Sequence, residues 1–203
     1  MPLTDLGRAA ALSGGLTDAI THISLHSAIP NDAGSNELSG GSYARQAVTW
    51  GAPAAGVVDS SGQMTHEVPG GATVAAYGYW TAPTGGSFLG WAPLNGVRHA
   101  VATADATGNT LTSAGHGLAA GARVLVYGLM DEALPGGLAE GTVYYVVGST
   151  TNGFQLAATS GGSAIDLTSG GHLWWQTVVP ETYGSAGQLI TADGGLTLDM
   201  TAL

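Results

Sequence analysis

Alternating apolar and polar positions dominate the chain and predict short β-strands. In Ala19–His26, Ile23 and Leu25 fall on one face of such a strand, and the other face carries His22, Ser24 and His26. A period of two is typical of a strand with one side buried. The same alternation predicts further strands in the first half of the chain over Tyr43–Trp50, Gln63–Val68, Thr73–Trp80 and Phe88–Pro93.

Glycine and proline separate these runs. The chain has 34 glycines and 8 prolines, which are spread between the runs rather than gathered in one linker. Turn residues at such spacing favour antiparallel sheets. We therefore predict an all-β fold, an antiparallel β-sandwich. Thr4–Leu12 has a capping threonine, apolar residues at helical spacing and a stop at Gly14-Gly15, which predicts one short N-terminal helix.

The pattern changes near Asn95, and the change predicts an inserted domain. We expect an outer β-sandwich formed by residues 1–95 and 176–203, interrupted by a small β-barrel-like domain over residues 96–175. Gln176–Pro180 and Gly187–Asp199 return to the earlier style, with Leu189, Thr191, Leu196, Leu198 and Met200 alternating. The strands expected in the insertion are Asn109–Ser113, Arg123–Gly128, Thr142–Gly148, Gly153–Ala158 and Ala164–Thr168.

The strongest hairpin signal in the chain is Thr151-Asn152-Gly153, between two strand runs of the insertion. An Asn-Gly pair accepts the positive φ angles of a type I′ turn, which matches the twist of antiparallel strands. We expect such a turn here.

Charge and cysteine content narrow the classes of function. Fourteen carboxylates, four arginines and no lysine give a net charge of −10. Nucleic-acid binding and docking on anionic lipid are not expected, because basic residues provide most of that affinity. No apolar run approaches the roughly 18 residues of a membrane-spanning helix. The lack of cysteine removes disulfides and thiol chemistry, and the start of the chain resembles no secretory leader. We expect synthesis in a cytoplasm.

Three blocks of the predicted outer domain carry recognisable motifs. The first runs from His22-Ile23-Ser24-Leu25-His26 through Pro30–Gly34, Glu37 and Gly40-Gly41 to Tyr43-Ala44-Arg45-Gln46. The second contains Gly78-Tyr79-Trp80 and Gly86–Trp91, and the third runs from Val179-Pro180-Glu181 to Leu198. These blocks resemble small tail-fibre and minor tail proteins of phages that infect actinobacteria and related bacteria. In the insertion, Asn109–Leu118, Gly136–Val147 and Phe154–Ala157 are similar to a β module that recurs in phage tail and fibre proteins.

The resemblance implies a structural virion protein of a phage tail that acts by assembly and by contact with the host surface. It also implies a homo-oligomer, a trimer by analogy with other fibre parts, that contacts other tail proteins and needs no cofactor. Two alternatives stay open: a capsid decoration or head-fibre protein, and a carbohydrate-binding module. The family brings no catalytic motif, and we expect no enzyme activity.

Candidate chemistry in the sequence is sparse. His22 and His26 would lie about 13 Å apart along a strand, which is too far for one metal ion. Gly115-His116-Gly117-Leu118-Ala119-Ala120 matches a dinucleotide fingerprint, but Gly121 interrupts the helix that such a site needs, and a glycine turn between strands is the better interpretation.

The sequence also contains the residue types of two catalytic arrangements. Asp18, Ser24 and His26 are the residue types of a catalytic triad. A carboxylate pair for glycoside cleavage could come from Asp131, Glu132, Glu140, Glu181 and Asp193. No spacing in the sequence distinguishes either set from coincidence.

Aromatic residues are the remaining candidates for contact with a partner or a glycan. These are Tyr79, Trp80, Trp91, Trp174 and Trp175. Neighbouring residues on a strand point to opposite faces, so Trp174 and Trp175 cannot both fill one core. We expect one of the two at an interface or on a surface where a sugar ring can stack.

Overall fold

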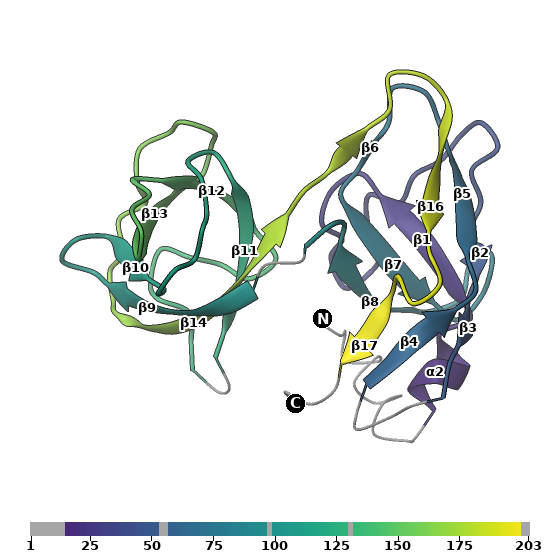
Figure 1. Cartoon of the computed structure of the whole chain (residues 1–203), viewed down its shortest axis with the longest axis horizontal. Helices are drawn as coiled ribbons and strands as arrows, with labels where there is room; N and C mark the ends of the chain where they lie inside the picture. The colour runs from purple at the N-terminus through teal and green to yellow at the C-terminus, as the bar shows by residue number, and fades with distance from the viewer. Residues whose placement is uncertain (1–14, 53–56, 97–98, 130–131, 200–203) are drawn as a thin grey trace. The chain divides into compact units, whose positions relative to one another are not determined.

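The computed structural model describes residues 15–52, 57–96, 99–129 and 132–199 (Figure 1). The chain divides into two compact units, residues 1–94 with 180–203, here called the outer unit, and residues 95–179, here called the barrel unit. Antiparallel strands form nearly all of the described regular structure, and α2 (Leu16–Ala19) is a single helical turn. The predicted all-β class is confirmed. The helix predicted over Thr4–Leu12 lies outside the described residues.

One layer of the outer unit is a four-stranded antiparallel sheet in the order β2-β1-β7-β8. These strands are β2 (Gln46–Ala47), β1 (His22–His26), β7 (Ala76–Trp80) and β8 (Phe88–Pro93). The central pair β1 and β7 is in register over its whole length, with Ser24 opposite Gly78. This pairing fixes which side chains of the two strands share a face.

The other strands of the outer unit form short sheets. They are β3 (Thr49–Trp50), β4 (Val57–Ser61), β5 (Met64–Val68), β6 (Thr73–Val74), β15 (Glu181–Thr182), β16 (Gly187–Thr191) and β17 (Thr197–Asp199). β16 pairs with β5, β15 pairs with β6, and β17 pairs with β4, which also pairs with β3. One apolar cluster joins both sets of strands, and it includes Ile23, Leu25, Tyr79, Leu189 and Leu198. The buried alternation of Leu189, Thr191, Leu196 and Leu198 is as the sequence predicts.

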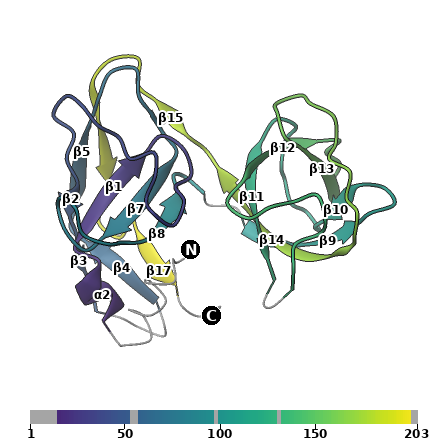
Figure 2. The same ribbon diagram turned by 180° about the vertical axis from the view of Figure 1, so that it is seen from behind.

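The barrel unit is a closed barrel in the order β10-β13-β12-β11-β14-β9 (Figure 2). Its strands are β9 (His99–Asp105), β10 (Thr110–Thr112), β11 (Arg123–Gly128), β12 (Val143–Val147), β13 (Gly153–Ala157) and β14 (Gly171–Val178). Phe154, Leu173 and Trp175 fill the interior. Closure pairs every strand on both sides and leaves no free edge in this unit.

One strand predicted in the insertion is wrong, and so is the assignment of Gln176–Pro180 to the outer domain. Ala164–Thr168 is no strand. Ala164 makes one isolated bridge to Ala157, and the Ile165 N–H donates to the Leu156 carbonyl of β13, but the Leu167 N–H donates to the Asn109 side chain instead of a strand. Gln176–Pro180 does not return to the outer unit, because Gln176, Thr177 and Val178 continue β14 along β11. The barrel unit therefore extends to Val179, four residues beyond the predicted end of the insertion at 175.

The Asn-Gly hairpin between β12 and β13 is present, but its turn is not of the predicted type. Neither Asn152 nor Gly153 has a positive φ; the left-handed residue of this loop is Gly148, at φ 56°. Thr150 closes the loop, with its N–H donating to the Gly153 carbonyl at 2.8 Å. The Asn152 side chain instead accepts a hydrogen bond from the Gly115 N–H at 3.0 Å. Asn152 therefore joins two loops of the barrel unit.

Helices that are long and apolar enough to span a membrane do not occur among the described residues.

Candidate functional site

The most connected polar cluster in the outer unit surrounds Ser24 and His26 on the central strand β1. The Ser24 hydroxyl and His26 Nε2 are 2.7 Å apart. Trp80 Nε1–H donates to the Ser24 oxygen at 2.8 Å, and His26 Nδ1 lies 2.7 Å from the Ser35 carbonyl. Ser24 and His26 are both 0% exposed. The expectation that β1 is buried on one side only is therefore wrong for Ser24 and His26.

The hydrogen bonds around His26 determine its tautomer. A backbone carbonyl only accepts, so His26 Nδ1 must carry the proton that binds Ser35. In the neutral ring Nε2 is then an acceptor, and the Ser24 hydroxyl donates to it while accepting from Trp80. Burial lowers the pKa of His26, which keeps this neutral form. Every polar atom of the Ser24–His26 pair thus has a defined partner.

Arg45 extends the cluster to the surface. Its guanidinium carbon lies 3.4 Å from the centroid of the Trp80 ring. Arg45 Nε and Nη2 donate to the two carboxylate oxygens of Glu37 at 2.8 and 2.7 Å, and Nη1 donates to the carbonyls of Ala82 and Gly85. A planar guanidinium suits both the paired carboxylate bonds and stacking on an aromatic ring.

Tyr43 links the same Glu37 to the strand. Its hydroxyl donates to Glu37 Oε1 at 3.2 Å and accepts from the Leu25 N–H at 2.9 Å. We call the whole set the β1 network: Ser24, His26, Ser35, Glu37, Tyr43, Arg45 and Trp80. It holds the long connection between β1 and β2 against the sheet.

Two glycines make room for the β1 network. A Cβ at Gly78 would lie 2.3 Å from His26 Nε2 and 2.4 Å from the Ser24 hydroxyl. A Cβ at Gly34, whose φ is +72°, would lie 2.5 Å from the Trp80 ring. Both positions therefore require glycine, one for space and one for space and backbone angle together.

The β1 network contains a hydroxyl and an imidazole, the groups of a nucleophile and its base, but a substrate cannot reach them. A catalytic serine must meet a substrate carbonyl, and Ser24 is fully buried under Trp80 and Arg45. The ring of His26 is oriented by a backbone carbonyl, and no bond to Asp18 accompanies it among the interactions of the described residues. The predicted triad types are thus brought together only in part, and as a packing device.

Glu37 and Arg45 both lie in the first recognisable motif of the sequence, but their pairing was not predicted. Glu37 and Arg45 lie eight residues apart in a chain in which only 9% of residues are charged. That rarity, with the opposite signs, was the available signal. Their partner Trp80 comes from a strand more than thirty residues later, which a local pattern does not reveal.

The other buried histidine of the outer unit is His66 on β5. Its Nε2 lies 3.2 Å from the Ile23 carbonyl, and its Nδ1 has no hydrogen-bond partner. Burial lowers its pKa. The hydroxyl of Tyr79, on β7, is also buried without a hydrogen bond. Burial raises its pKa. Neither group reaches solvent, so both belong to the core.

The acidic candidates are divided between the two units. Glu132 and Glu140 lie in the barrel unit, Glu181 and Asp193 lie in the outer unit, and Asp131 lies outside the described residues. Glu140 accepts from the Gly128 N–H and Asp193 from the Gly62 N–H, so both fix turns. No group of three or more histidine, aspartate or glutamate side chains that could hold a metal ion occurs in the described parts of the chain, and His22 and His26 are no exception.

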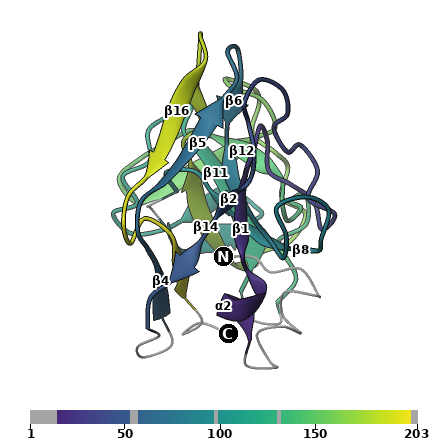
Figure 3. The same cartoon turned by 90° about the vertical axis from the view of Figure 1, so that its right-hand side faces the viewer.

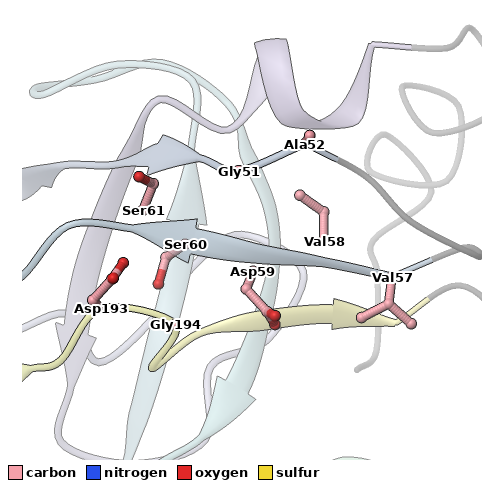
Figure 4. A pocket seen from close by; sticks show the side chains of 9 residues that line it. All are labelled: Gly51, Ala52, Val57, Val58, Asp59, Ser60, Ser61, Asp193 and Gly194. Carbon is pink, nitrogen blue, oxygen red and sulfur yellow. The ribbon is translucent and has the colours of Figure 1, made fainter.

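An open hollow of about 430 Å³ lies beside β4 (Figure 4). Two carboxylates line it, and both are already engaged: Asp59 accepts from the Thr197 hydroxyl at 2.7 Å, and Asp193 holds the Gly62 turn. The other lining residues are Gly51, Ala52, Val57, Val58, Ser60, Ser61 and Gly194. The Ser60 hydroxyl accepts from the Leu196 N–H. The hollow contains no pairing of a nucleophile with a base.

The glycine-rich segment at 115–121 forms a turn between strands, as predicted. Gly115 and Gly117 both have a φ of 60°, and strand β11 follows without a helix. His116 is buried, and its Nδ1 accepts from the Leu118 N–H at 3.0 Å. The dinucleotide fingerprint therefore lacks the helix N-terminus on which its chemistry depends.

Four of the five aromatic candidates are buried. Tyr79, Trp80, Trp91 and Trp175 are at most 7% exposed. Trp174 is half-buried on the outer side of the barrel, in register with Val101 and Tyr127, and its ring lies 5.7 Å from that of His99. The opposite orientation of Trp174 and Trp175 agrees with the strand geometry expected from the sequence. Trp174 is therefore the one candidate whose ring retains an accessible side in the described structure.

The chain is similar to a known protein family over part of its length. Residues 17–113 match a family described as "Podophage GP4 fiber I protein gp80". The matched segment begins in α2, contains the complete β1 network and ends just beyond β10. This segment is therefore similar to a phage fibre protein family. No curated protein matches the chain.

Proposed function

We propose that this chain is a structural component of a phage tail fibre, made in the cytoplasm of the infected host and assembled into the virion. The observation that carries the proposal is the family match over residues 17–113. The motif resemblance at both ends of the outer unit extends the proposal to phages of actinobacteria and related bacteria.

The proposed action is assembly rather than catalysis. Ser24 and His26 are the residue types of a nucleophile and its base, but their side-chain polar atoms are all engaged in hydrogen bonds within the chain. Arg45 is likewise held by Glu37 and Trp80. Such a network makes a rigid platform, because buried polar groups that are all paired specify a single arrangement. No cofactor enters this function.

We further propose that the chain is a homo-oligomer, a trimer, in contact with other tail proteins. Support comes from the low charge content and from exposed aliphatic side chains on Val101 and Val179. Sedimentation equilibrium measures the mass directly. A mass that stays that of one chain at all concentrations would remove the self-association part of the proposal.

Antibody labelling of intact particles tests the fibre assignment. We expect antibodies raised against the purified chain to decorate the tail fibres in electron micrographs. Decoration of the capsid would favour the head-fibre alternative, and decoration of the tail end alone would favour a minor tail protein. Particles that carry no label after mild detergent exposure would contradict a virion role.

A second candidate function is glycan contact through Trp174. Aromatic rings stack on the apolar faces of sugars, and the neighbouring Glu132 and His172 side chains, which lie 3.4 Å apart, offer hydrogen bonds to hydroxyl groups. Trp174→Ala should then reduce binding of the purified protein to host cell-envelope glycans, while Val179→Ala should not. Equal binding by both variants would remove the glycan role and leave the structural one.

A further inference from the structure

Strand β16 forms the edge of a two-stranded sheet. It pairs with β5 over its whole length, from Gly187 opposite Val68 to Thr191 opposite Met64. Figure 3 shows β16 at the margin of the outer unit with β5 on its inner side. Within the residues that the structure describes, no strand pairs with the other side of β16. Its outer backbone N–H and C=O groups thus form a template for one more strand.

Nothing in β16 protects this edge. Proteins usually block exposed edges with lysine, other charges, proline or a bulge. β16 has the sequence Gly-Gln-Leu-Ile-Thr, which contains none of these residues, and its pairing with β5 is regular. Leu189 and Thr191 point into the core and fix the strand, whereas Ile190 is 58% exposed. Ile190 is the most exposed large aliphatic residue that the structure describes.

Three carboxylates lie near strand β16, from its start to just beyond its end. At the start, the Tyr183 ring packs on Gly187, and its hydroxyl donates to Glu181 at 3.0 Å. In the middle, Gln188 Nε2 donates to Glu67 Oε1 at 2.6 Å. Asp193 follows the strand by two residues. The one arginine among the described residues of the outer unit, Arg45, is already paired with Glu37.

The negative charge near β16 favours a positively charged partner strand. A second copy of the chain would bring the same carboxylates and has no lysine to offset them. Like charges placed opposite each other across a strand pair destabilise it, and complementary charges steer a partner to the surface. We infer that the free edge of β16 accepts an extended segment with lysine or arginine residues from a different virion protein, which adds a strand to the β5–β16 sheet. The inference rests on the proposed virion function.

The composition of the chain supplies a direct test. It contains neither cysteine nor lysine, so the Ile190→Cys variant carries a single thiol, and a thiol-to-amine crosslinker attached there can reach a lysine only on another protein. The variant would be built into particles and crosslinked in the assembled virion, with mass spectrometry of the product. Val101→Cys on the barrel unit is the matched control, since Val101 is also an exposed β-branched residue on a strand.

We expect Ile190→Cys particles to give a conjugate of this chain with a second virion protein, through a lysine in an extended segment. Val101→Cys should not give that conjugate. If the particles are held at a higher salt concentration before crosslinking, the yield of the conjugate should fall, because salt screens exposed charge pairs. Gln188→Cys, also exposed on β16, provides a second thiol if the first variant folds poorly.

Three results would overturn the inference. They are conjugates made only through the N-terminal amine of a second copy, the same partner captured by Val101→Cys, and no conjugate from either β16 variant in particles that carry antibody label on their fibres. A β16 conjugate in particles whose fibres are unlabelled would instead contradict the fibre assignment and leave the edge contact standing.

Discussion

Replacing Gly78 by alanine should destabilise the outer unit strongly. Gly78 lies directly opposite Ser24 in the β1–β7 pair. The new methyl carbon would lie 2.3 Å from His26 Nε2 and 2.4 Å from the Ser24 hydroxyl, where van der Waals contact needs a full ångström more. These atoms are themselves held at 2.7 Å by their hydrogen bond. The Gly78→Ala variant can therefore accommodate the methyl group only by separating Ser24 from His26.

The expected cost follows from what that separation leaves behind. Each buried polar group without a partner costs about 1–3 kcal/mol, and overpacking adds about 1–3 kcal/mol. Alanine offsets up to about 1 kcal/mol, because it is a better strand residue than glycine. With the hydrogen bond between Ser24 and His26 lost on both sides, the free energy of unfolding should fall by about 2–9 kcal/mol. A domain of this size has only about 5–15 kcal/mol in total.

Urea unfolding followed by tryptophan fluorescence measures this loss. Trp80, which donates to Ser24, is itself a reporter of the outer unit. Gly184→Ala is the matched control: Gly184 has no atom within 4 Å of its would-be Cβ and no strained φ, so its variant should unfold like the wild type. A Gly78→Ala protein within 1 kcal/mol of the wild type, roughly the scatter of ordinary surface changes, would refute the reasoning about the β1 network.

Three further outcomes follow from the structure. Burial lowers the folded-state pKa of His26 and of His66 below 6.5, so the unfolded chain binds more protons under acid conditions. The free energy of unfolding should therefore stay nearly constant between about pH 7.5 and 9 and fall by up to about 2.7 kcal/mol per pH unit below pH 6.5; a flat profile between about pH 7.5 and 5 would contradict this. Trp175→Ala should cost about 3–5 kcal/mol in urea unfolding, because Trp175 is 2% exposed in the barrel, whereas Trp174→Ala should cost less than half as much; equal losses would place both rings in the core. Residues 95–179, expressed alone, should show a cooperative thermal transition, since the barrel closes within that segment; a chain without one would show that the barrel unit needs the outer unit.

The strands that the sequence predicts best are those with large apolar residues on the buried side. Phe88–Pro93 and Arg123–Gly128 have the predicted bounds, because phenylalanine, tryptophan, valine and leucine mark their inner positions. Strand β9 (His99–Asp105) was not predicted. Its buried positions include Ala102 and Ala104, and alanine is too small a hydrophobic residue to mark a buried face by itself.

The candidate site was less predictable than the fold, because its roles depend on partners that are distant in the chain. Alternation correctly placed Ser24 and His26 on the polar face of β1, but not that this face is buried. Its cover comes from Trp80, with Arg45 stacked on the ring. Similarly, the turn preference of Asn152 was overridden by a hydrogen bond to Gly115 in another loop. The alternation of residues along a strand thus predicts on which face a side chain lies. Contacts with residues distant in the chain determine whether that face is exposed to solvent.

A cryo-electron microscopy map of the intact particle, at a resolution that resolves side chains, tests the central claim most directly. We expect density in the tail fibre that fits the described residues between 15 and 94, with Arg45 stacked on Trp80. This density should be repeated around a threefold axis of the fibre. Density for this chain in the capsid alone, or fibres built from other chains throughout, would contradict it.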